Sequence, residues 1–193
     1  MLYVVSQVFN VGARRQIQPL LRALRHHSTL VAAVCELLSE ELPRRKPDGA
    51  MLASLTHDIG TLAVLVRAEK VPTLIGNGQL LNPLIEALHG DIGRAMLQAW
   101  RFPAKLVSVV AGHEHLTRRS PRPVDYVDVV MVANLVSHAG DDNRLAPDDW
   151  SAIPAVGKIG LEAEELLLLL AKAKHNEAKL TRPLVPLLRQ TGT

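Results

Sequence analysis

The stretch Ala53-Ser-Leu-Thr-His-Asp-Ile-Gly-Thr-Leu-Ala-Val64 sets an adjacent histidine and aspartate, His57 and Asp58, inside an otherwise apolar segment. Burying these two side chains costs free energy unless something compensates for the water they lose. A divalent metal ion is the usual compensation, because an imidazole nitrogen and a carboxylate oxygen form a ligand set that such ions accept. The stretch therefore predicts a core helix that carries a candidate metal site near its end.

Further candidate ligands occur on both sides of this pair, and they fall on separate predicted helices. They are His27 before the pair, and His89, His113, Glu114 and Asn134 after it. Core metal sites in helical bundles are built from side chains that project inward from different helices. One cation bound by Asp58, or two cations bridged by it, would activate water and neutralise a phosphate group. The alternative is a histidine cluster held by hydrogen bonds alone.

Hydrophobic residues recur at helical spacing along nearly the whole chain, and no segment alternates convincingly at the period of a strand. The sequence therefore predicts an all-α fold, a compact multi-helix bundle. Gly60 is expected to end one helix, residues 70–82 to form a loop, and Asn82-Pro83 to begin the next helix. The expected helices are residues 12–25, Ser28 to Pro43, Asp48 to Gly60, a short one through Leu65, Pro83 to Trp100, Pro103 to His113–His115, Tyr126 to Ala139, a short one from Pro147 and the last from Gly160.

Composition and charge exclude several classes of protein. Of the 193 residues, 48% are hydrophobic and 21% charged, which is typical of a globular domain with a real core. The net charge is only +3 and the basic residues are scattered, so no nucleic-acid-binding face is predicted. The single cysteine, Cys35, favours a reducing compartment. The longest apolar run, Leu166 to Ala171, is too short to span a bilayer and no signal sequence opens the chain, so we expect a cytoplasmic protein without a membrane contact.

Several polar residues outside the candidate site are expected to face solvent. These are His26, His138 and His175. We expect His115 to be a helix-end cation, with a metal ligand as the alternative. Arg118, Arg119 and Arg122 are expected to form a solvated loop, with contacts to a phosphorylated ligand as the alternative.

Six segments, taken in order, resemble the HDOD (HD-related output domain) branch of the HD metal-dependent phosphohydrolase superfamily. Any one of them is a weak match, whereas their shared order and spacing are specific. They are Leu24-Arg-His-His-Ser-Thr-Leu-Val-Ala32, Met51 to Val66 with Leu55-Thr-His-Asp-Ile-Gly60, His89-Gly-Asp-Ile-Gly-Arg-Ala-Met-Leu-Gln-Ala-Trp-Arg-Phe-Pro-Ala104, Ala111-Gly-His-Glu-His115, Val130-Met-Val-Ala-Asn-Leu-Val136 and Ile159-Gly-Leu-Glu-Ala-Glu-Glu-Leu166.

The resemblance implies an HD-type helical bundle with one or two Fe, Mn or Zn ions, or a cluster that has lost its metal. It also implies Asp58 as the catalytic residue if the protein is active. The sequence departs from the catalytic pattern at Asn134, where HD enzymes have aspartate, at Glu114, where a second histidine is common, and at Thr61, where phosphodiesterase relatives carry lysine. The implied ligand set is His27, His57, Asp58, His89, His113, Glu114 and Asn134.

These departures favour a non-catalytic output module of bacterial signal transduction that acts through protein contacts. The alternative is a metal-dependent phosphohydrolase or phosphodiesterase acting on a nucleotide or cyclic dinucleotide. We expect residues 1–25 to be the remnant of an N-terminal lobe, 26–180 the HD/HDOD domain and 181–193 a loosely attached tail. A shortened lobe would leave an apolar face for a signalling partner or a second copy, giving a homodimer.

Overall fold

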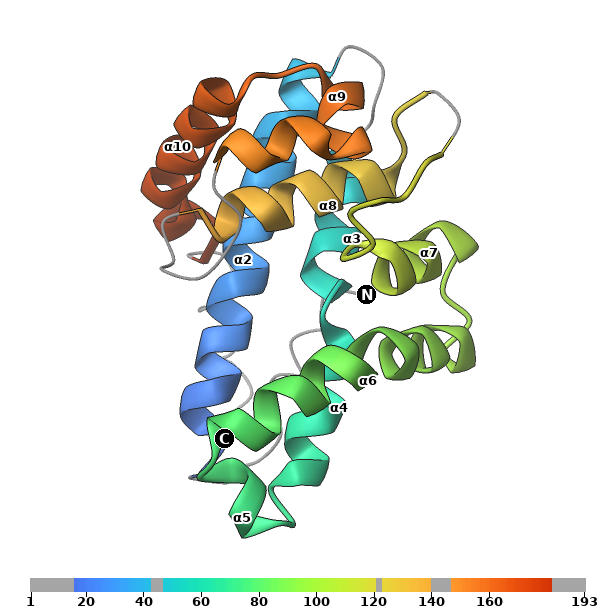
Figure 1. Cartoon of the computed structure of the whole chain (residues 1–193), viewed down its shortest axis with the longest axis vertical. Coiled ribbons are helices and arrows are strands. Elements are labelled where there is room, and N and C mark those ends of the chain that lie inside the picture. The colour runs from blue at the N-terminus through green and yellow to red at the C-terminus, as the bar shows by residue number, and fades with distance from the viewer. Residues whose placement is uncertain (1–15, 43–46, 121–122, 140–146, 182–193) are drawn as a thin grey trace, which may run out of the picture.

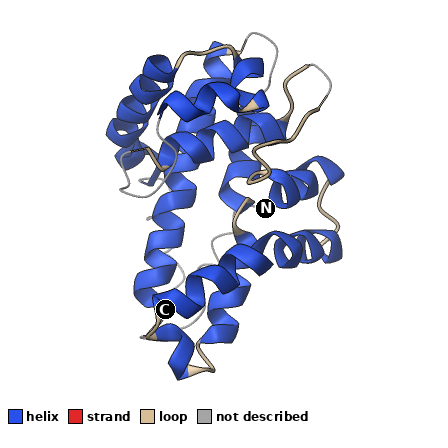
Figure 2. Ribbon diagram, viewed as in Figure 1, coloured by secondary structure: helices blue, strands red, loops and turns tan. Residues whose placement is uncertain are grey.

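The computed structural model describes residues 16–42, 47–120, 123–139 and 147–181, and these residues form helices joined by short loops (Figure 1). No strand occurs among them (Figure 2), so the predicted all-α class is confirmed. The elements are α2 (Gln18–Glu41), α3 (Pro47–Thr56), α4 (Ile59–Ala68), α5 (Pro72–Ile75), α6 (Gly78–Ala99), α7 (Ala104–Gly112), α8 (Tyr126–Ser137), the 3₁₀ helix η1 (Pro147–Ala152), α9 (Pro154–Ile159) and α10 (Ala163–Thr181).

The long helix α2 is continuous, and the predicted break at Ser28 is wrong. Ser28 is buried in the middle of the helix, and the next residue, Thr29, donates its hydroxyl to the carbonyl of Arg25 one turn earlier, at 2.8 Å. A serine or threonine that is a good N-cap can also lie inside a helix when its hydroxyl finds such a carbonyl. The apolar spacing from Leu24 to Leu38 continues across the supposed break, and this packing holds the helix together.

The helix break in the middle of the molecule falls at His57 and Asp58, between α3 and α4. Gly60, predicted to end a helix, instead lies in the first turn of α4 and is buried. A Cβ atom at Gly60 would lie only 1.8 Å from the carbonyl oxygen of His89 on α6, so the two helices approach closely because this residue is glycine. Gly93 on α6 faces the same crossing, since a Cβ there would lie 3.1 Å from the backbone nitrogen of Gly60.

Helix α6 begins earlier than Asn82-Pro83, so that predicted start is also wrong. The side chain of Asn77 caps the helix by accepting from the backbone N–H of Gln79 at 3.1 Å, and Pro83 lies inside. The cap satisfies an orphan N–H at the helix start, whereas Pro83 only removes one later hydrogen bond. Part of the expected loop 70–82 is thereby taken up by α5 and the first turn of α6.

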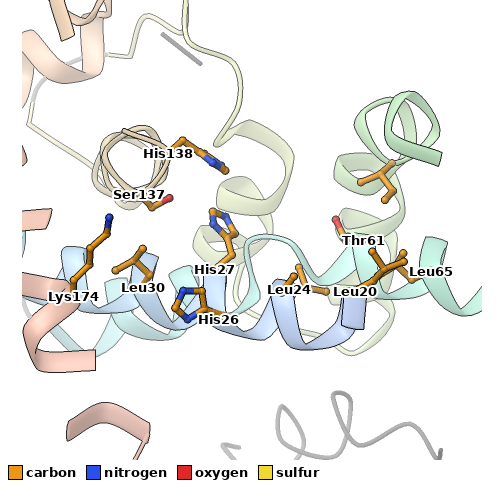
Figure 3. A pocket seen from close by; sticks show the side chains of 12 residues that line it. Leu20, Leu24, His26, His27, Leu30, Thr61, Leu65, Ser137, His138 and Lys174 are labelled. Atoms are coloured by element: carbon orange, nitrogen blue, oxygen red, sulfur yellow. The ribbon is translucent and has the colours of Figure 1, made fainter. Parts of the chain in front are cut away.

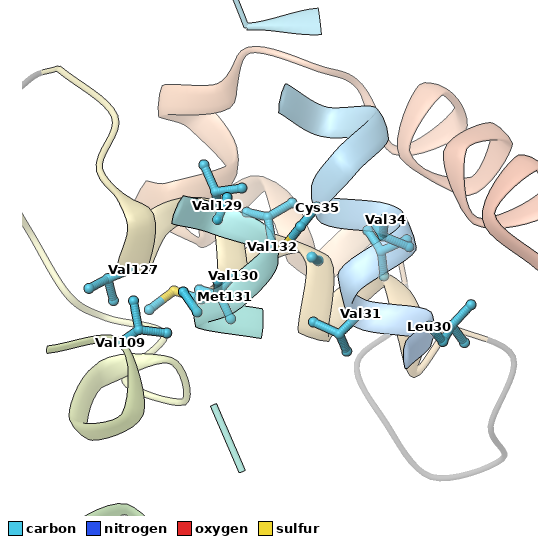
Figure 4. Packing of buried hydrophobic residues seen from close by; sticks show 14 of the residues in the cluster. Leu30, Val31, Val34, Cys35, Val109, Val127, Val129, Val130, Met131 and Val132 are labelled. Carbon is cyan, nitrogen blue, oxygen red and sulfur yellow. The ribbon is translucent and has the colours of Figure 1, made fainter. Parts of the chain in front are cut away.

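The core lies between α2 and α8, with α3 and α10 packed against α2. Figure 4 shows valines of α8 facing a row of aliphatic residues on α2. Cys35 is fully buried there, and burial raises the pKa of its thiol to about 12, so the thiol is inert. The buried residues labelled on these two helices are Leu30, Val31, Val34, Cys35, Val127, Val129, Val130, Met131 and Val132.

One segment, Gly49–Ala68, is long and apolar enough by composition to cross a membrane, with a mean hydropathy of 1.4. It comprises most of α3 and all of α4, and 61% of it is buried inside the protein. The turn at His57 and Asp58 divides it. In this fold its first half, α3, packs against α2, and its second half, α4, packs against α6.

The predicted N-terminal remnant and C-terminal tail lie largely outside the described residues. Residues 1–15 and 182–193 belong to that part of the chain, and Arg122 does so as well. The domain boundaries at residues 25 and 180 therefore stay predictions.

Candidate metal centre

Asp58 lies in the turn between α3 and α4, and its carboxylate is surrounded by imidazole nitrogens. Its side chain is only 18% exposed, and each of the four histidines around it presents Nε2. The distances from Nε2 to the nearer Asp58 oxygen are 3.3 Å for His113, 3.4 Å for His57, 3.6 Å for His27 and 3.9 Å for His89.

The four histidines come from four parts of the chain, as the sequence led us to expect. His27 lies in the middle of α2, His57 directly after α3, His89 within α6, and His113 at the C-cap of α7. The close approach of α4 to α6 at Gly60 brings His89 to the turn that holds Asp58. The fold thus assembles in space what is dispersed in the sequence.

Three of these histidines are oriented by backbone carbonyls. The Nδ1 atom of His57 donates to the carbonyl of Ser54 at 2.6 Å, and that of His89 to the carbonyl of Ile85 at 2.9 Å. The Nδ1 atom of His113 lies 3.2 Å from the carbonyl of Val110. Since a carbonyl only accepts, each neutral ring carries its proton on Nδ1 and directs the Nε2 lone pair toward Asp58. Metal-binding histidines are usually oriented by such contacts.

The side chains form two compact ligand groups that share Asp58. One contains His27, His57 and Asp58, and the other contains Asp58, His89 and His113; within each group the ligand atoms lie within 4.8 Å of one another. The Nε2 atoms of His27 and His57 are also hydrogen-bonded to each other at 3.2 Å. A carboxylate with two oxygens can serve both groups, so the arrangement has room for one or two cations.

The electrostatics of the cluster suit cation binding. Burial, with neighbouring His57, lowers the pKa of His27 to about 3, and burial lowers that of His57 to about 4. Burial alone would raise the pKa of Asp58, but His57 and His113 hold it well below its usual value. Although burial opposes it, the Asp58 carboxylate raises the pKa of His113. At neutral pH the site therefore offers the Asp58 carboxylate and the neutral imidazoles of His27 and His57, which are the forms that bind metals.

Asn134 and Glu114 lie beside these groups rather than within them. Both line a cavity of about 140 Å³ together with Asp58, His27 and His89. Asn134 is 8% exposed, and its Oδ1 atom is buried without a hydrogen-bond partner. Glu114 is more open, with its side chain 42% exposed and its Oε2 atom 3.4 Å from Nε2 of His89.

Unpaired polar atoms provide a test of whether these residues fit a metal ion. Besides Oδ1 of Asn134, Nε2 of His113 is buried and makes no well-aligned hydrogen bond, although it lies 3.3 Å from Asp58. Buried polar atoms are nearly always satisfied. The nitrogen lies beside the Asp58 carboxylate, and Asn134 lines a cavity with Asp58; an imidazole nitrogen and an amide oxygen are both donors that a divalent cation accepts. The donor set therefore fits a metal.

The sequence analysis missed His138, which it placed on the surface. At the C-cap of α8, the His138 ring stacks on His27 with centroids 4.8 Å apart and planes at 26°. His138 also lines the cavity that contains Asp58. The signal was its position four residues after Asn134, which sets both side chains on one face of a helix. His26, His115 and His175, in contrast, are exposed as predicted.

The loop after His113 is not simply solvated, because Arg118 belongs to a buried ionic network. Its guanidinium lies 2.8 Å from the fully buried carboxylate of Asp128 and also pairs with Asp125. Lys158 of α9 reaches Asp128 at 2.9 Å and also contacts Ser120. The sequence feature that could have indicated this network is the capping box Asp125-x-x-Asp128 at the start of α8. Arg119 is exposed as expected.

A second, larger cavity of about 420 Å³ adjoins the first (Figure 3). His27, Thr61, Ile85 and His138 line both. Aliphatic residues of α2, among them Leu20, form much of its wall, and Figure 3 shows His26 and Lys174 among its lining side chains. The cluster around Asp58 therefore borders a space large enough for a small molecule.

Comparisons with known proteins agree with this fold. The HDOD domain family matches residues 2–116. No curated protein matches the chain. A solved structure from Shewanella amazonensis SB2B, described as a "putative metal-dependent phosphohydrolase", is similar with a TM-score of 0.64 and 23% identity, over 88% of this chain and 65% of that one. At this identity the likeness shows the fold, and the chain spans 65% of the length of that relative.

Proposed function

This chain belongs to the HDOD domain family, and from that premise we propose that it is a regulatory module of bacterial signal transduction. In this proposal its histidine–aspartate centre holds a divalent cation, and its output is made through protein contacts rather than hydrolysis. The free, buried thiol of Cys35 fits a reducing compartment, and we propose that the protein acts in the cytoplasm.

One observation carries the metal proposal: three Nδ1 atoms lie on backbone carbonyls while the corresponding Nε2 atoms converge on one carboxylate. A carbonyl partner on Nδ1 leaves the Nε2 lone pair of each ring to face a cation or another donor. Here the lone pairs point at Asp58 and at the cavity beside it. Imidazole nitrogens suit Zn, Fe and Mn to different degrees, and a set rich in them favours Zn or Fe.

His27, His57, Asp58, His89 and His113 would hold the cation, with Asn134 and Glu114 beside it. A bound divalent cation supplies Lewis acidity, which polarises phosphate oxygens and lowers the pKa of water. The chain's own residues fix the imidazoles and exclude bulk water from the inner side, where His57 and His113 are almost fully buried.

The residues around the centre favour regulation over turnover. Asn134 contributes a neutral oxygen where the resemblance implies a carboxylate, which weakens the hold on a second cation. Thr61, where the resemblance implies a lysine, lines the cavity and contributes no positive charge to it. The candidate ligands around Asp58 thus support metal binding more than they support hydrolysis of a phosphate.

The first test is the metal content of the purified protein. We expect near-stoichiometric Zn, Fe or Mn in the parent protein and a loss of most of it in His57→Ala and in Asp58→Ala, measured by elemental analysis. His175→Ala, which removes an exposed imidazole on α10, is the matched control and should leave the metal content unchanged. A parent protein that stays metal-free after reconstitution would refute the metal centre.

The alternative, a phosphohydrolase, is favoured by the cavity of about 420 Å³ that adjoins the centre. The relative from Shewanella amazonensis is described in the same terms. A screen of nucleotides and cyclic dinucleotides with the metal-loaded protein separates the two. Our proposal expects no turnover by the parent protein, and turnover that is abolished in Asp58→Ala would establish the enzyme instead. Asn134→Asp, which restores a carboxylate, tests whether the asparagine at this position is the reason that the parent protein does not hydrolyse nucleotides.

Exposed apolar residues on α6 support a role in protein contacts. Leu80 and Leu88 are 53% and 39% exposed, and Leu84 and Ile92 are half-buried. Their spacing of four residues aligns them in one row along the helix. Large apolar side chains that gather on one exposed helix face are typical of interaction surfaces. We propose that this α6 stripe contacts a second copy of the chain.

A further inference from the structure

Helix α8 directs two polar side chains toward the same cavity. Asn134 and His138 are four residues apart, so they lie one above the other on one helix face. Both line the cavity of about 140 Å³ that also contains Asp58 and His89. Around them α8 is almost wholly apolar and buried, from Val127 to Val136. The C-terminal part of α8 thus presents the unpaired amide of Asn134 and, one turn later, the imidazole of His138 to this cavity.

His138 is attached to the histidine cluster through His27. The two rings are stacked, with centroids 4.8 Å apart and planes at 26°. Figure 3 shows them reaching toward each other from α8 and α2. The Nε2 atom of His27 in turn lies 3.2 Å from His57 and 3.6 Å from Asp58. His138 is therefore the outermost member of a continuous series of polar side chains that ends at the shared carboxylate.

We propose that His138 is a further ligand for the cation, on the wall of the cavity that α8 contributes, here called the outer wall. The inference rests on the proposed metal centre and adds to it a residue that neither compact ligand group contains. Asn134, whose buried Oδ1 atom has no partner, is the second donor on that wall. His138 supplies an imidazole nitrogen, which is a stronger ligand for a divalent transition metal than the amide oxygen of Asn134.

This assignment has a consequence for metal selectivity. With His138, the outer wall offers an imidazole and an amide in place of a carboxylate, so the whole centre becomes richer in nitrogen. Imidazole donors favour Zn²⁺, Co²⁺ and Ni²⁺, whereas Mg²⁺ and Ca²⁺ prefer sites built from oxygen. The centre should therefore discriminate strongly against Mg²⁺, and His138 should contribute to that discrimination.

The test compares two substitutions of His138 in the full chain by titration with Zn²⁺ and with Co²⁺, whose visible absorption reports the ligands. His138→Ala removes both the nitrogens and the ring, whereas His138→Phe keeps a flat ring to stack on His27. We expect both variants to bind Zn²⁺ at least about tenfold more weakly, and to change the Co²⁺ spectrum, because they lack the same nitrogen. His175→Ala should match the parent protein.

Three results would overturn the inference, and they are distinguishable. If the parent protein binds no cation, the proposed metal centre fails and the role of His138 fails with it. If the parent protein binds but both variants match it in affinity and spectrum, the centre stands and His138 is not a ligand. If His138→Phe binds like the parent while His138→Ala does not, His138 acts by stacking alone. Thermal unfolding of the metal-free variants checks that each is folded.

Discussion

Gly60 determines how closely α4 can approach α6, and this approach brings His89 to Asp58. A Cβ atom there would lie 1.8 Å from the carbonyl oxygen of His89, and 2.8 Å from the backbone nitrogen of Gly93. Backbone atoms cannot yield as a flexible side chain can, so any added atom must separate the helices. The residue acts on the site entirely through geometry, since it contributes no ligand.

Gly60→Ala should therefore impair both stability and metal binding. We expect a loss of about 3 kcal/mol in the free energy of unfolding, at the upper end of the usual cost of overpacking, because the added atom meets backbone rather than a flexible side chain. The measurement is urea unfolding of the metal-free protein, followed by Zn²⁺ titration.

Gly157 on α9 provides the matched control, because a Cβ there would have no neighbour within 4 Å. Gly157→Ala should be neutral or slightly stabilising, since alanine favours a helix over glycine. Equal stability of the two alanine variants would show that the α4–α6 crossing is not tight.

At the scale of single residues, the sequence indicated the inner part of the site better than the outer part. An adjacent His57 and Asp58 in an apolar stretch are costly to bury, and that cost is visible without a structure. His138 was missed because a histidine near a helix end has the same local sequence whether it faces water or a cavity. Arg118 was missed for a similar reason, since its partner Asp128 is buried only in the folded chain.

At the scale of elements, the ionic network ties the loop after His113 to α8 and α9. Asp128 accepts from Arg118 and Lys158, and Asp125 accepts from Arg118 while capping α8. The loop that carries Glu114 is therefore held at one end by α7 and at the other by these charges. Breaking the network should loosen the loop next to the candidate site.

The network should make stability depend on pH in the acidic range. Burial alone would raise the pKa of Asp125, but the hydrogen bond and charge of Arg118 lower it below its ordinary value of 3.8. A carboxyl whose pKa is depressed in the folded state stabilises the protein above its unfolded pKa, and that contribution is lost as the pH falls through the folded pKa. We expect the free energy of unfolding to fall below about pH 4, measured by urea titrations between pH 7 and pH 3.

Asp125→Asn should show a smaller fall, because asparagine still caps the helix but cannot form the ion pair. Asp91→Asn is the control, since the Asp91 side chain is 78% exposed and pairs with Arg94 one turn away. If Asp125→Asn lost as much stability as the parent protein between pH 7 and pH 3, a carboxyl other than Asp125 would cause the loss of stability in acid.

The helix boundaries show where local sequence rules are overruled. Ser28 and Asn82-Pro83 both carry start signals, yet each lies within a longer helix. In the first case apolar packing on both sides outweighs a single cap, and in the second an earlier cap at Asn77 competes successfully. The existence of the helices was predictable from their periodicity, whereas their ends depend on tertiary contacts that periodicity does not contain.

At the scale of the whole molecule, the histidine cluster and the α6 stripe share one helix. His89 is buried on the inner face of α6, while Leu88, its neighbour in the chain, is 39% exposed on the outer face. Cation binding at Asp58 would fix His89 and with it the position of α6. The position of the α6 stripe would therefore depend on whether the centre holds a cation. Such coupling between two sites is what a regulatory module requires.

The last prediction concerns assembly through the α6 stripe of Leu80, Leu84, Leu88 and Ile92. We expect the parent protein to form a homodimer, because an apolar row on one helix can pair with itself about a two-fold axis. Leu80→Glu with Leu88→Glu should yield a monomer, since both side chains are exposed and their replacement leaves the core intact. Light scattering after size-exclusion chromatography measures the mass. Leu168→Glu on α10, where Leu168 is 56% exposed, is the control and should remain a dimer. A parent protein that is monomeric at all concentrations would assign the stripe to a signalling partner instead.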